Sequence, residues 1–122
     1  MYKTEVLCFM KISKELAKGS TALLVMSVLS KGDMYGYQII KTVEAMSEEV
    51  FQMNEGTLYP ILHSLEKEGY LTSYSCEVEG RQRKYYKITE KGIRQFAEKK
   101  NEWNIFSNAV AKVLEGAELA NA

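Results

Sequence analysis

The sequence predicts a mainly α-helical protein with one β-hairpin, arranged as a winged helix-turn-helix followed by a long C-terminal dimerisation helix. Three observations lead to this fold class. Apolar residues recur at helical spacing as far as residue 69. The period then changes to two over residues 70–88, which are rich in Tyr, Thr, Val and Ile. Finally, an apolar stripe spaced by sevens runs over residues 96–117.

Length and composition indicate one globular domain of ordinary polarity. The 122 residues are 46% hydrophobic and 26% charged, and no run approaches the roughly 20 apolar residues that span a bilayer. An acidic residue near the N-terminus argues against a signal peptide, so we expect a cytoplasmic protein with no membrane partner. We expect no enzymatic activity, metal or cofactor, because one histidine and two distant cysteines form no ligand or catalytic spacing. Cys8 and Cys76 are expected to be small apolar fillers.

The apolar pattern of the first half of the chain predicts three helices. Residues 1–18 are expected to form an amphipathic helix, and residues 21–30 are apolar on nearly every side, which predicts a central buried helix. After a turn at 31–33, a helix over 35–47 is expected to face inward with Ile39, Ile40, Val43 and Met46. A connection over 48–53, without the usual tight-turn glycine, leads to the next helix.

Residues 54–69 predict the helix on which the functional interpretation depends. Its inward residues fall at i, i+3, i+4 and i+7: Leu58, Ile61, Leu62 and Leu65. Asn54 is the expected N-cap and Gly69 the C-terminal stop. Because Pro60 removes an amide donor and disfavours helical geometry at Tyr59, the first turn is expected to be loose or separate. Two helices with so short a connection resemble a helix-turn-helix.

A basic hairpin is predicted directly after that helix. Residues 70–78 and 82–88 are the expected strands, and residues 79–81 have hairpin character. The formal net charge is zero, yet residues 81–100 hold eight Lys and Arg against two Glu, which gives +6. A segregated basic zone is typical of polyanion binders, although basic runs are also often solvated faces. In a winged helix-turn-helix the helix enters the major groove, and the hairpin reaches phosphates or the minor groove.

The last part of the chain predicts one long helix. Residues 89–92 are expected to cap and start it, and it is expected to run to about residue 115 and to fray over residues 117–122. So small a domain has little core against which this helix can pack its apolar stripe. We therefore expect a second copy of the chain to cover the stripe. The expected dimer interface consists of Ile93, Phe96, Trp103, Val110 and Leu114. The expected organisation is a DNA-binding domain over 1–92 and a dimerisation helix over 93–122, in one compact unit.

Four blocks, in the right order and spacing from about residue 20 to 92, resemble the PadR family of bacterial transcriptional regulators. They are Tyr35-Gly36-Tyr37-Gln38-Ile39, Gly56-Thr57-Leu58-Tyr59-Pro60-Ile61-Leu62, Leu65-Glu66-Lys67-Glu68-Gly69-Tyr70-Leu71 and Arg83-Lys84-Tyr85-Tyr86-Lys87-Ile88-Thr89-Glu90-Lys91-Gly92. The chain looks like the short branch, in which one C-terminal helix replaces a larger domain. The resemblance implies a homodimer that represses transcription at a palindromic operator in double-stranded DNA. In some members an aromatic or phenolic small molecule releases the DNA.

The candidate DNA-binding residues come from three segments, with the recognition helix and the wing placed by the resemblance. They are Tyr37, Lys41, Thr57, Tyr59, His63, Arg81, Arg83 and Lys84. Structural alternatives stay open for several of them. Tyr37 can belong to the core, Tyr59 can pack on the wing, and His63 can be a surface histidine without a role. The hairpin that carries Arg81, Arg83 and Lys84 can be simply solvated.

Trp103 is the centre of a candidate ligand site. It lies mid-helix near the expected dimer axis, where paired indoles can form a slot for a flat ligand. Phe96, Phe106 and Val110 are expected to line the same surface, and simple dimer packing is the alternative. The rival function for the whole chain is a protein-interaction module that uses the basic hairpin on an acidic partner.

Overall fold

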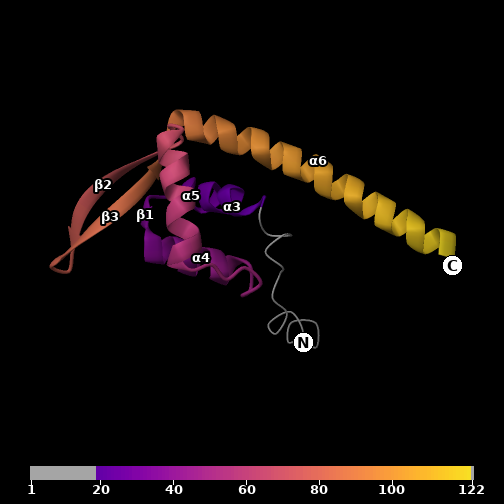
Figure 1. The fold of residues 1–122 in the computed structure, drawn as a ribbon, viewed down its shortest axis with the longest axis horizontal. Helices are drawn as coiled ribbons and strands as arrows, with labels where there is room; N and C mark the ends of the chain where they lie inside the picture. The colour runs from indigo at the N-terminus through magenta and orange to yellow at the C-terminus, as the bar shows by residue number, and fades with distance from the viewer. Residues whose placement is uncertain (1–18, 122) are drawn as a thin grey trace.

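The computed structural model describes residues 19–121, so the helix expected over 1–18 lies outside the described residues. The elements follow in the order α3 (Thr21–Leu29), β1 (Met34–Tyr35), α4 (Gly36–Met46), α5 (Glu55–Lys67), β2 (Leu71–Val78), β3 (Arg81–Ile88) and α6 (Glu90–Asn121). The helices α3, α4 and α5 gather at the base of a small sheet, the hairpin extends to one side, and α6 runs out to the other (Figure 1). The predicted fold of a mainly helical winged helix-turn-helix with one hairpin and a long last helix is confirmed, while the dimerising role of that helix stays a prediction.

The core lies where α3, α4, α5 and the base of the sheet meet. Its buried side chains are Val25, Met26, Val28, Leu29, Ile39, Ile40, Val43, Leu58, Leu62, Leu65, Leu71, Tyr86 and Ile88. The central position predicted for α3 is confirmed, as is the inward face of α4 up to Val43. Met46 was expected in this core but is 56% exposed, because the last turn of α4 extends past the residues that cover Val43.

The connection between α4 and α5 turns without glycine. Glu48 and Glu49 both adopt left-handed backbone conformations, with φ of 52° and 68°. The Ser47 hydroxyl accepts a 3.0 Å hydrogen bond from the Phe51 amide, and Phe51 and Met53 pack against the core. Two non-glycine residues with positive φ therefore provide the turn that a glycine usually allows.

The helix α5 is continuous through Pro60, so the expected loose or separate first turn is wrong. Asn54 caps the helix as predicted, since its Oδ1 accepts a 2.9 Å hydrogen bond from the Thr57 amide. The carbonyl that loses its partner to the proline belongs to Gly56, which is exposed, so water can satisfy it. At the other end the chain turns at Gly69, whose φ is 83°, as expected for a glycine after the C-cap.

The sheet has three strands in the order β1-β3-β2, and β1 was not predicted. Glu79 and Gly80 form the hairpin turn, both with positive φ, as a type I′ turn requires. Arg81 is therefore the first residue of β3 rather than part of the turn. Cys76, expected to be a buried filler, is exposed, because β2 has already left the core at this point.

The long helix α6 begins as predicted and ends later than predicted. The Thr89 hydroxyl accepts a 3.0 Å hydrogen bond from the Gly92 amide and so caps the helix, which continues to Asn121 instead of ending near residue 115. Its exposed apolar side chains are Ile93, Trp103, Ile105, Phe106, Val110, Val113 and Leu114. Within the described residues, none of the helices is both long and apolar enough to cross a membrane.

Candidate nucleic-acid interface

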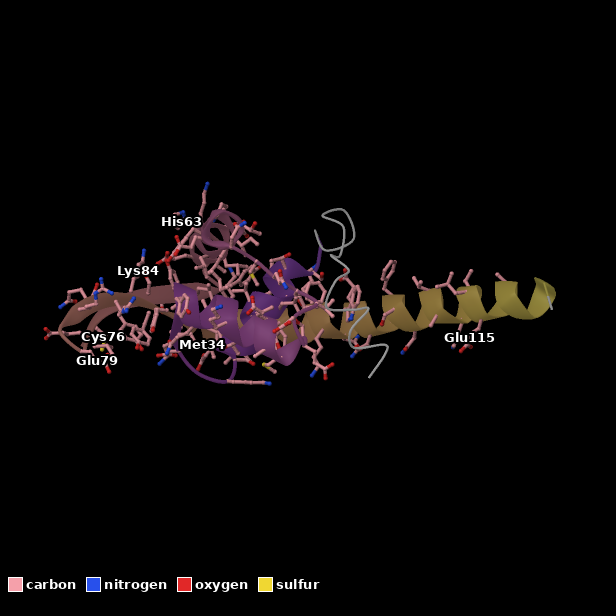
Figure 2. All side chains as sticks on the ribbon, turned by 90° about the horizontal axis from the view of Figure 1, so that it is seen from below. Met34, His63, Cys76, Glu79, Lys84 and Glu115 are labelled. Atoms are coloured by element: carbon pink, nitrogen blue, oxygen red, sulfur yellow. The ribbon has the colours of Figure 1, made fainter. Side chains whose placement is uncertain are left out.

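The outer face of α5 is set by the burial of its inner face. Leu58, Leu62 and Leu65 are buried in the core, which turns Thr57 and His63 outward, where both are exposed. Thr57 lies in the first turn, where the amides and the positive end of the helix dipole favour an anion. His63 lies further along α5 and also points outward (Figure 2). This face therefore presents hydrogen-bonding groups along an accessible helix.

Tyr59 extends from α5 toward the start of α4. A Cβ placed on Gly36 would lie 2.5 Å from the Tyr59 hydroxyl oxygen, so the ring occupies the space that a side chain at position 36 would fill. Burial raises the pKa of Tyr59, and the carboxylate of Glu55 raises it further, while Lys84 acts in the opposite direction. The hydroxyl is therefore protonated at neutral pH and available as a hydrogen-bond donor between α4 and the hairpin.

Tyr37 and Lys41 form an exposed pair on α4. Tyr37 is 57% exposed, so the alternative that places it in the core is wrong. The Lys41 ammonium lies 5.6 Å from the centre of the Tyr37 ring, and it also pairs with Glu44 at 3.6 Å. Both contacts are at the surface, and they leave the lysine free to exchange Glu44 for a phosphate at small cost.

The strand register divides the three basic residues of the hairpin between its two faces. Lys84 pairs with Ser75 and lies on the same face as the buried Tyr86, which is the face toward α5. Figure 2 shows Lys84 on the side where α5 carries His63, with Cys76 on the opposite side. Arg83 pairs with Cys76 and belongs to that opposite face, together with Arg81.

Arg83 is not a free cation. Its guanidinium carbon lies 4.6 Å from the centre of the Tyr35 ring, and its Nε is buried without a hydrogen-bond partner among the described residues. The structure therefore places His63 and Lys84 on one side of the molecule, while Arg83 is held on the other. Tyr59 lies close enough to Lys84 to feel its charge, and Thr57 is exposed on a different flank of α5.

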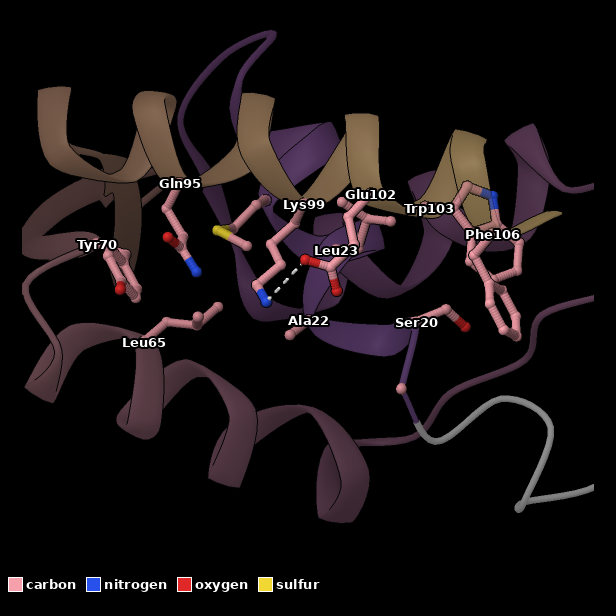
Figure 3. Close-up of a pocket in the computed structure, with 12 residues that line it drawn as sticks. Ser20, Ala22, Leu23, Leu65, Tyr70, Gln95, Lys99, Glu102, Trp103 and Phe106 are labelled. Atoms are coloured by element: carbon pink, nitrogen blue, oxygen red, sulfur yellow. Dashed lines mark ion pairs between the residues drawn. The ribbon is translucent and has the colours of Figure 1, made fainter. Parts of the chain in front are cut away.

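A second candidate site is a cavity of about 490 Å³ between α3, α5 and the first half of α6 (Figure 3). Trp103 and Phe106 line it, with their ring centres 6.0 Å apart. Phe96 and Val110 do not line it: Phe96 packs against the core, and Val110 is exposed further along α6. Sequence reasoning missed the remaining lining residues, which are Gly19, Ser20, Ala22, Leu23, Met26, Leu65, Tyr70, Gln95, Lys99 and Glu102.

Most of the polar side chains of this cavity come from α6, and Ser20 and Tyr70 add hydroxyl groups from outside it. Gln95 and Lys99 precede Trp103 by eight and four residues, so helical spacing alone could have placed them on its face. The Lys99 ammonium pairs with Glu102 at 3.5 Å. Among the residues that the structure describes, no group of three or more His, Cys, Asp or Glu side chains is arranged to hold a metal ion.

Comparison with known proteins gives one consistent result. The model of the transcriptional regulator PadR-like family matches residues 25–98. A transcriptional regulator from Clostridium thermocellum is 36% identical with a TM-score of 0.75, over 80% of this chain and 96% of that one. A PadR family regulator from Eggerthella lenta is 33% identical with a TM-score of 0.73, over 83% and 87%. The Escherichia coli transcriptional regulator YqjI is 27% identical over 83% of this chain, which spans 47% of that protein.

Proposed function

The chain belongs to the PadR-like family of transcriptional regulators, and from this premise we propose that it is a homodimeric repressor of a palindromic operator. Members of the family are DNA-binding transcriptional regulators and not enzymes. The observation that carries the proposal is the common direction of α5 and the hairpin. His63 on α5 and the Lys84 ammonium lie on one side, as a helix in the major groove and a wing on the adjacent backbone require.

Each candidate residue other than Arg83 has a task in this proposal. His63 reads a base edge from the exposed face of α5, while Thr57 and Tyr59 donate to phosphates near the helix N-terminus. Tyr37 and Lys41 hold the backbone from α4. Lys84 supplies a wing contact from the face toward α5, and Arg81, which lies on the other face, supplies one from its place beside the turn. Both contacts add salt-dependent affinity.

The exposed stripe of α6 supports the dimer. Trp103, Val110 and Leu114 are 46%, 41% and 60% exposed on a helix that projects beyond the other described elements (Figure 1). Together with Ile93 they continue the seven-residue repeat that a second α6 can cover, while Phe96 is shared between this stripe and the core. A two-fold pair of recognition helices matches two half-sites, which explains the proposed palindrome.

The cavity at Trp103 supports release by an aromatic or phenolic effector. Its volume of about 490 Å³ falls within the ~300–1,000 Å³ of small-molecule sites. Its walls combine the three aromatic rings of Tyr70, Trp103 and Phe106 with the amide of Gln95 and the ion pair of Lys99. Quenching of Trp103 fluorescence by a series of small phenols tests this part of the proposal. Phe106→Ala should weaken the quenching, whereas Val113→Ala, an exposed change outside the cavity, should not. Unquenched fluorescence at saturating phenol would remove the effector.

The main experiment is a fluorescence-anisotropy titration of duplex DNA from directly upstream of the gene, beside a scrambled duplex, at two salt concentrations. Specific affinity should exceed the non-specific affinity by at least about a thousandfold, and log affinity should fall steeply with log salt. Equal and weak binding to every segment of the flanking DNA contradicts the proposal. In that case, an acidic protein that displaces the weakly bound DNA would favour the rival function, a protein-interaction module that uses the basic hairpin.

A further inference from the structure

Three tyrosines form a row across the face of the sheet that lies away from α5. Tyr35 of β1 and Tyr74 of β2 both pair with Tyr85 of β3, so the three side chains share one face. The Tyr35 and Tyr85 rings meet edge to face at 5.5 Å, and the Tyr74 and Tyr85 rings stack at 5.7 Å. The Tyr74 hydroxyl donates a 2.7 Å hydrogen bond to Asp33. This row therefore attaches both hairpin strands to the segment that precedes α4.

Arg83 continues the row toward the hairpin turn. It lies two residues beyond Tyr85 on the same face, and its guanidinium carbon is 4.6 Å from the centre of the Tyr35 ring. A planar guanidinium stacks on an aromatic face in a way that an ammonium does not reproduce. Its Nε is removed from solvent without any hydrogen-bond partner in the described part of the chain. The group is thus placed for stacking and poorly placed for a two-pronged phosphate contact.

The hairpin needs such a contact because its outer half has no third strand. β1 pairs with β3 only at Tyr85 and Tyr86, so residues 76–84 form a two-stranded ribbon. Two-stranded hairpins are marginally stable in water without further packing. Arg83 reaches back from this ribbon to Tyr35, whose amide donates to Gln38 of the first turn of α4. The stack therefore joins the ribbon to the start of α4.

We propose that Arg83 is a positioning residue that fixes the angle of the wing relative to α5 through its stack on Tyr35, and is not a phosphate ligand. The inference rests on the proposed DNA-binding function for its consequence, but the anchor itself is a property of the free protein. Lys84, the next residue, carries the same charge on the opposite face, where its ammonium lies 5.4 Å from the centre of the Tyr86 ring of its own strand. It is the matched control, because this contact does not join the ribbon to α4.

The first arm of the test measures amide hydrogen exchange across residues 76–84 without DNA. Arg83→Lys, Arg83→Gln and Tyr35→Leu should each speed exchange several-fold, because each removes the stack, whereas Lys84→Gln should leave exchange unchanged. Arg83→Lys shows whether the positive charge or the planar guanidinium matters, because lysine keeps the charge and lacks the planar group. Wild-type exchange in Arg83→Lys overturns the proposal. Thermal melting of each variant separates local loosening from global unfolding.

The second arm measures affinity for the duplex that the wild-type protein selects from a random-sequence library. Arg83→Lys and Arg83→Gln should weaken binding by similar factors with an unchanged salt slope, whereas Lys84→Gln should lower the slope by about one per contact. The proposal is overturned if Arg83→Lys binds DNA as tightly as the wild type, or if Arg83→Gln flattens the slope of log affinity against log salt. It is also overturned if the Arg83 variants exchange faster but keep wild-type affinity. If the wild type selects no duplex, the proposed function fails, while the exchange arm still decides whether the anchor exists.

Discussion

The Thr89 hydroxyl donates a 2.7 Å hydrogen bond to the carbonyl oxygen of Gly69, which joins the start of α6 to the end of α5. Two further bonds cross the same junction: Lys91 to the Glu68 carbonyl at 2.8 Å, and the Thr89 amide to the Tyr70 carbonyl at 3.0 Å. These three hydrogen bonds therefore hold the start of α6 against the end of α5. Tyr70 also lines the Trp103 cavity, so a molecule bound there lies directly beside the junction.

Replacing Thr89 by valine should lower the free energy of unfolding by about 1–2 kcal/mol, because one hydroxyl caps α6 and also satisfies the Gly69 carbonyl. Valine keeps the shape and removes both hydrogen bonds. Thr89→Ser keeps the hydroxyl and should stay near the wild type. Urea unfolding of the three proteins measures the difference, and equal midpoints for valine and wild type would show that the junction contributes no stability.

Gly92→Ala should be more damaging, at about 1–3 kcal/mol. A Cβ at this position would overlap the Tyr70 carbonyl oxygen and lie 2.7 Å from Ile88 Cγ1. Backbone is the obstacle, so the first turn of α6 must shift away from β2. Gly116→Ala is the matched control in the same helix, where nothing lies within 4 Å, and it should stabilise the protein by up to ~1 kcal/mol. We expect the melting temperature to fall in Gly92→Ala and to rise in Gly116→Ala. A higher melting temperature in Gly92→Ala would contradict the packing at this junction.

The local features of α5 and the hairpin could be predicted because short-range chemistry determines them. Asn54 caps the third amide after it, and Gly69 takes the left-handed conformation that ends a helix. β1 could not be predicted in the same way, because a two-residue strand has no readable period and its partners at Tyr85 and Tyr86 lie far along the chain. Long-range pairing of this kind is set by the folded core and not by neighbouring residues.

The same limit applies to the candidate sites. Arg83 looks like a wing cation in the sequence, and only the pairing of β1 with β3 shows that Tyr35 lies beside it. The continuous helix at Pro60 is likewise a tertiary result, since Leu58 and Leu62 are both fully buried on either side of the proline. Burial of these flanking leucines outweighs the local preference against a helix.

Alkaline pH should weaken the row of tyrosines at Tyr74. The hydrogen bond to Asp33 is the main cause that raises the pKa of Tyr74 from 10.0 to about 12. The neutral hydroxyl is favoured in the folded state, so its contribution is fully present below pH 10 and is lost as the pH rises toward 12. Site-resolved NMR titration should show the Tyr74 pKa falling in Asp33→Ala relative to the wild type. An unchanged Tyr74 titration would contradict the bond.

Gly36→Ala should reduce DNA affinity with little change in stability. The new Cβ would lie 2.5 Å from the Tyr59 hydroxyl oxygen and 3.1 Å from Cζ, so the ring swings away from α4. If the hydroxyl donates to a phosphate, its loss costs about 2- to 10-fold in affinity, corresponding to one hydrogen bond. Gly32→Ala, with nothing within 4 Å, is the control, and Tyr59→Phe should match Gly36→Ala. Wild-type affinity in both Gly36→Ala and Tyr59→Phe would remove Tyr59 from the interface.

The apolar stripe of α6 gives the test of the dimer. Replacing Val110 and Leu114 by glutamate would place two charges in the proposed interface. Burying these carboxylates without partners costs more free energy than the association of the two helices gains. Sedimentation equilibrium should show the wild type at twice the 13.9 kDa chain mass and the double variant at 13.9 kDa, with Asn108→Glu on the opposite face unchanged. A monomeric wild type would contradict the proposal directly. If the monomeric variant keeps its helix content but binds the operator weakly, the loss belongs to the pairing of the two recognition helices, because each α5 is itself unaltered.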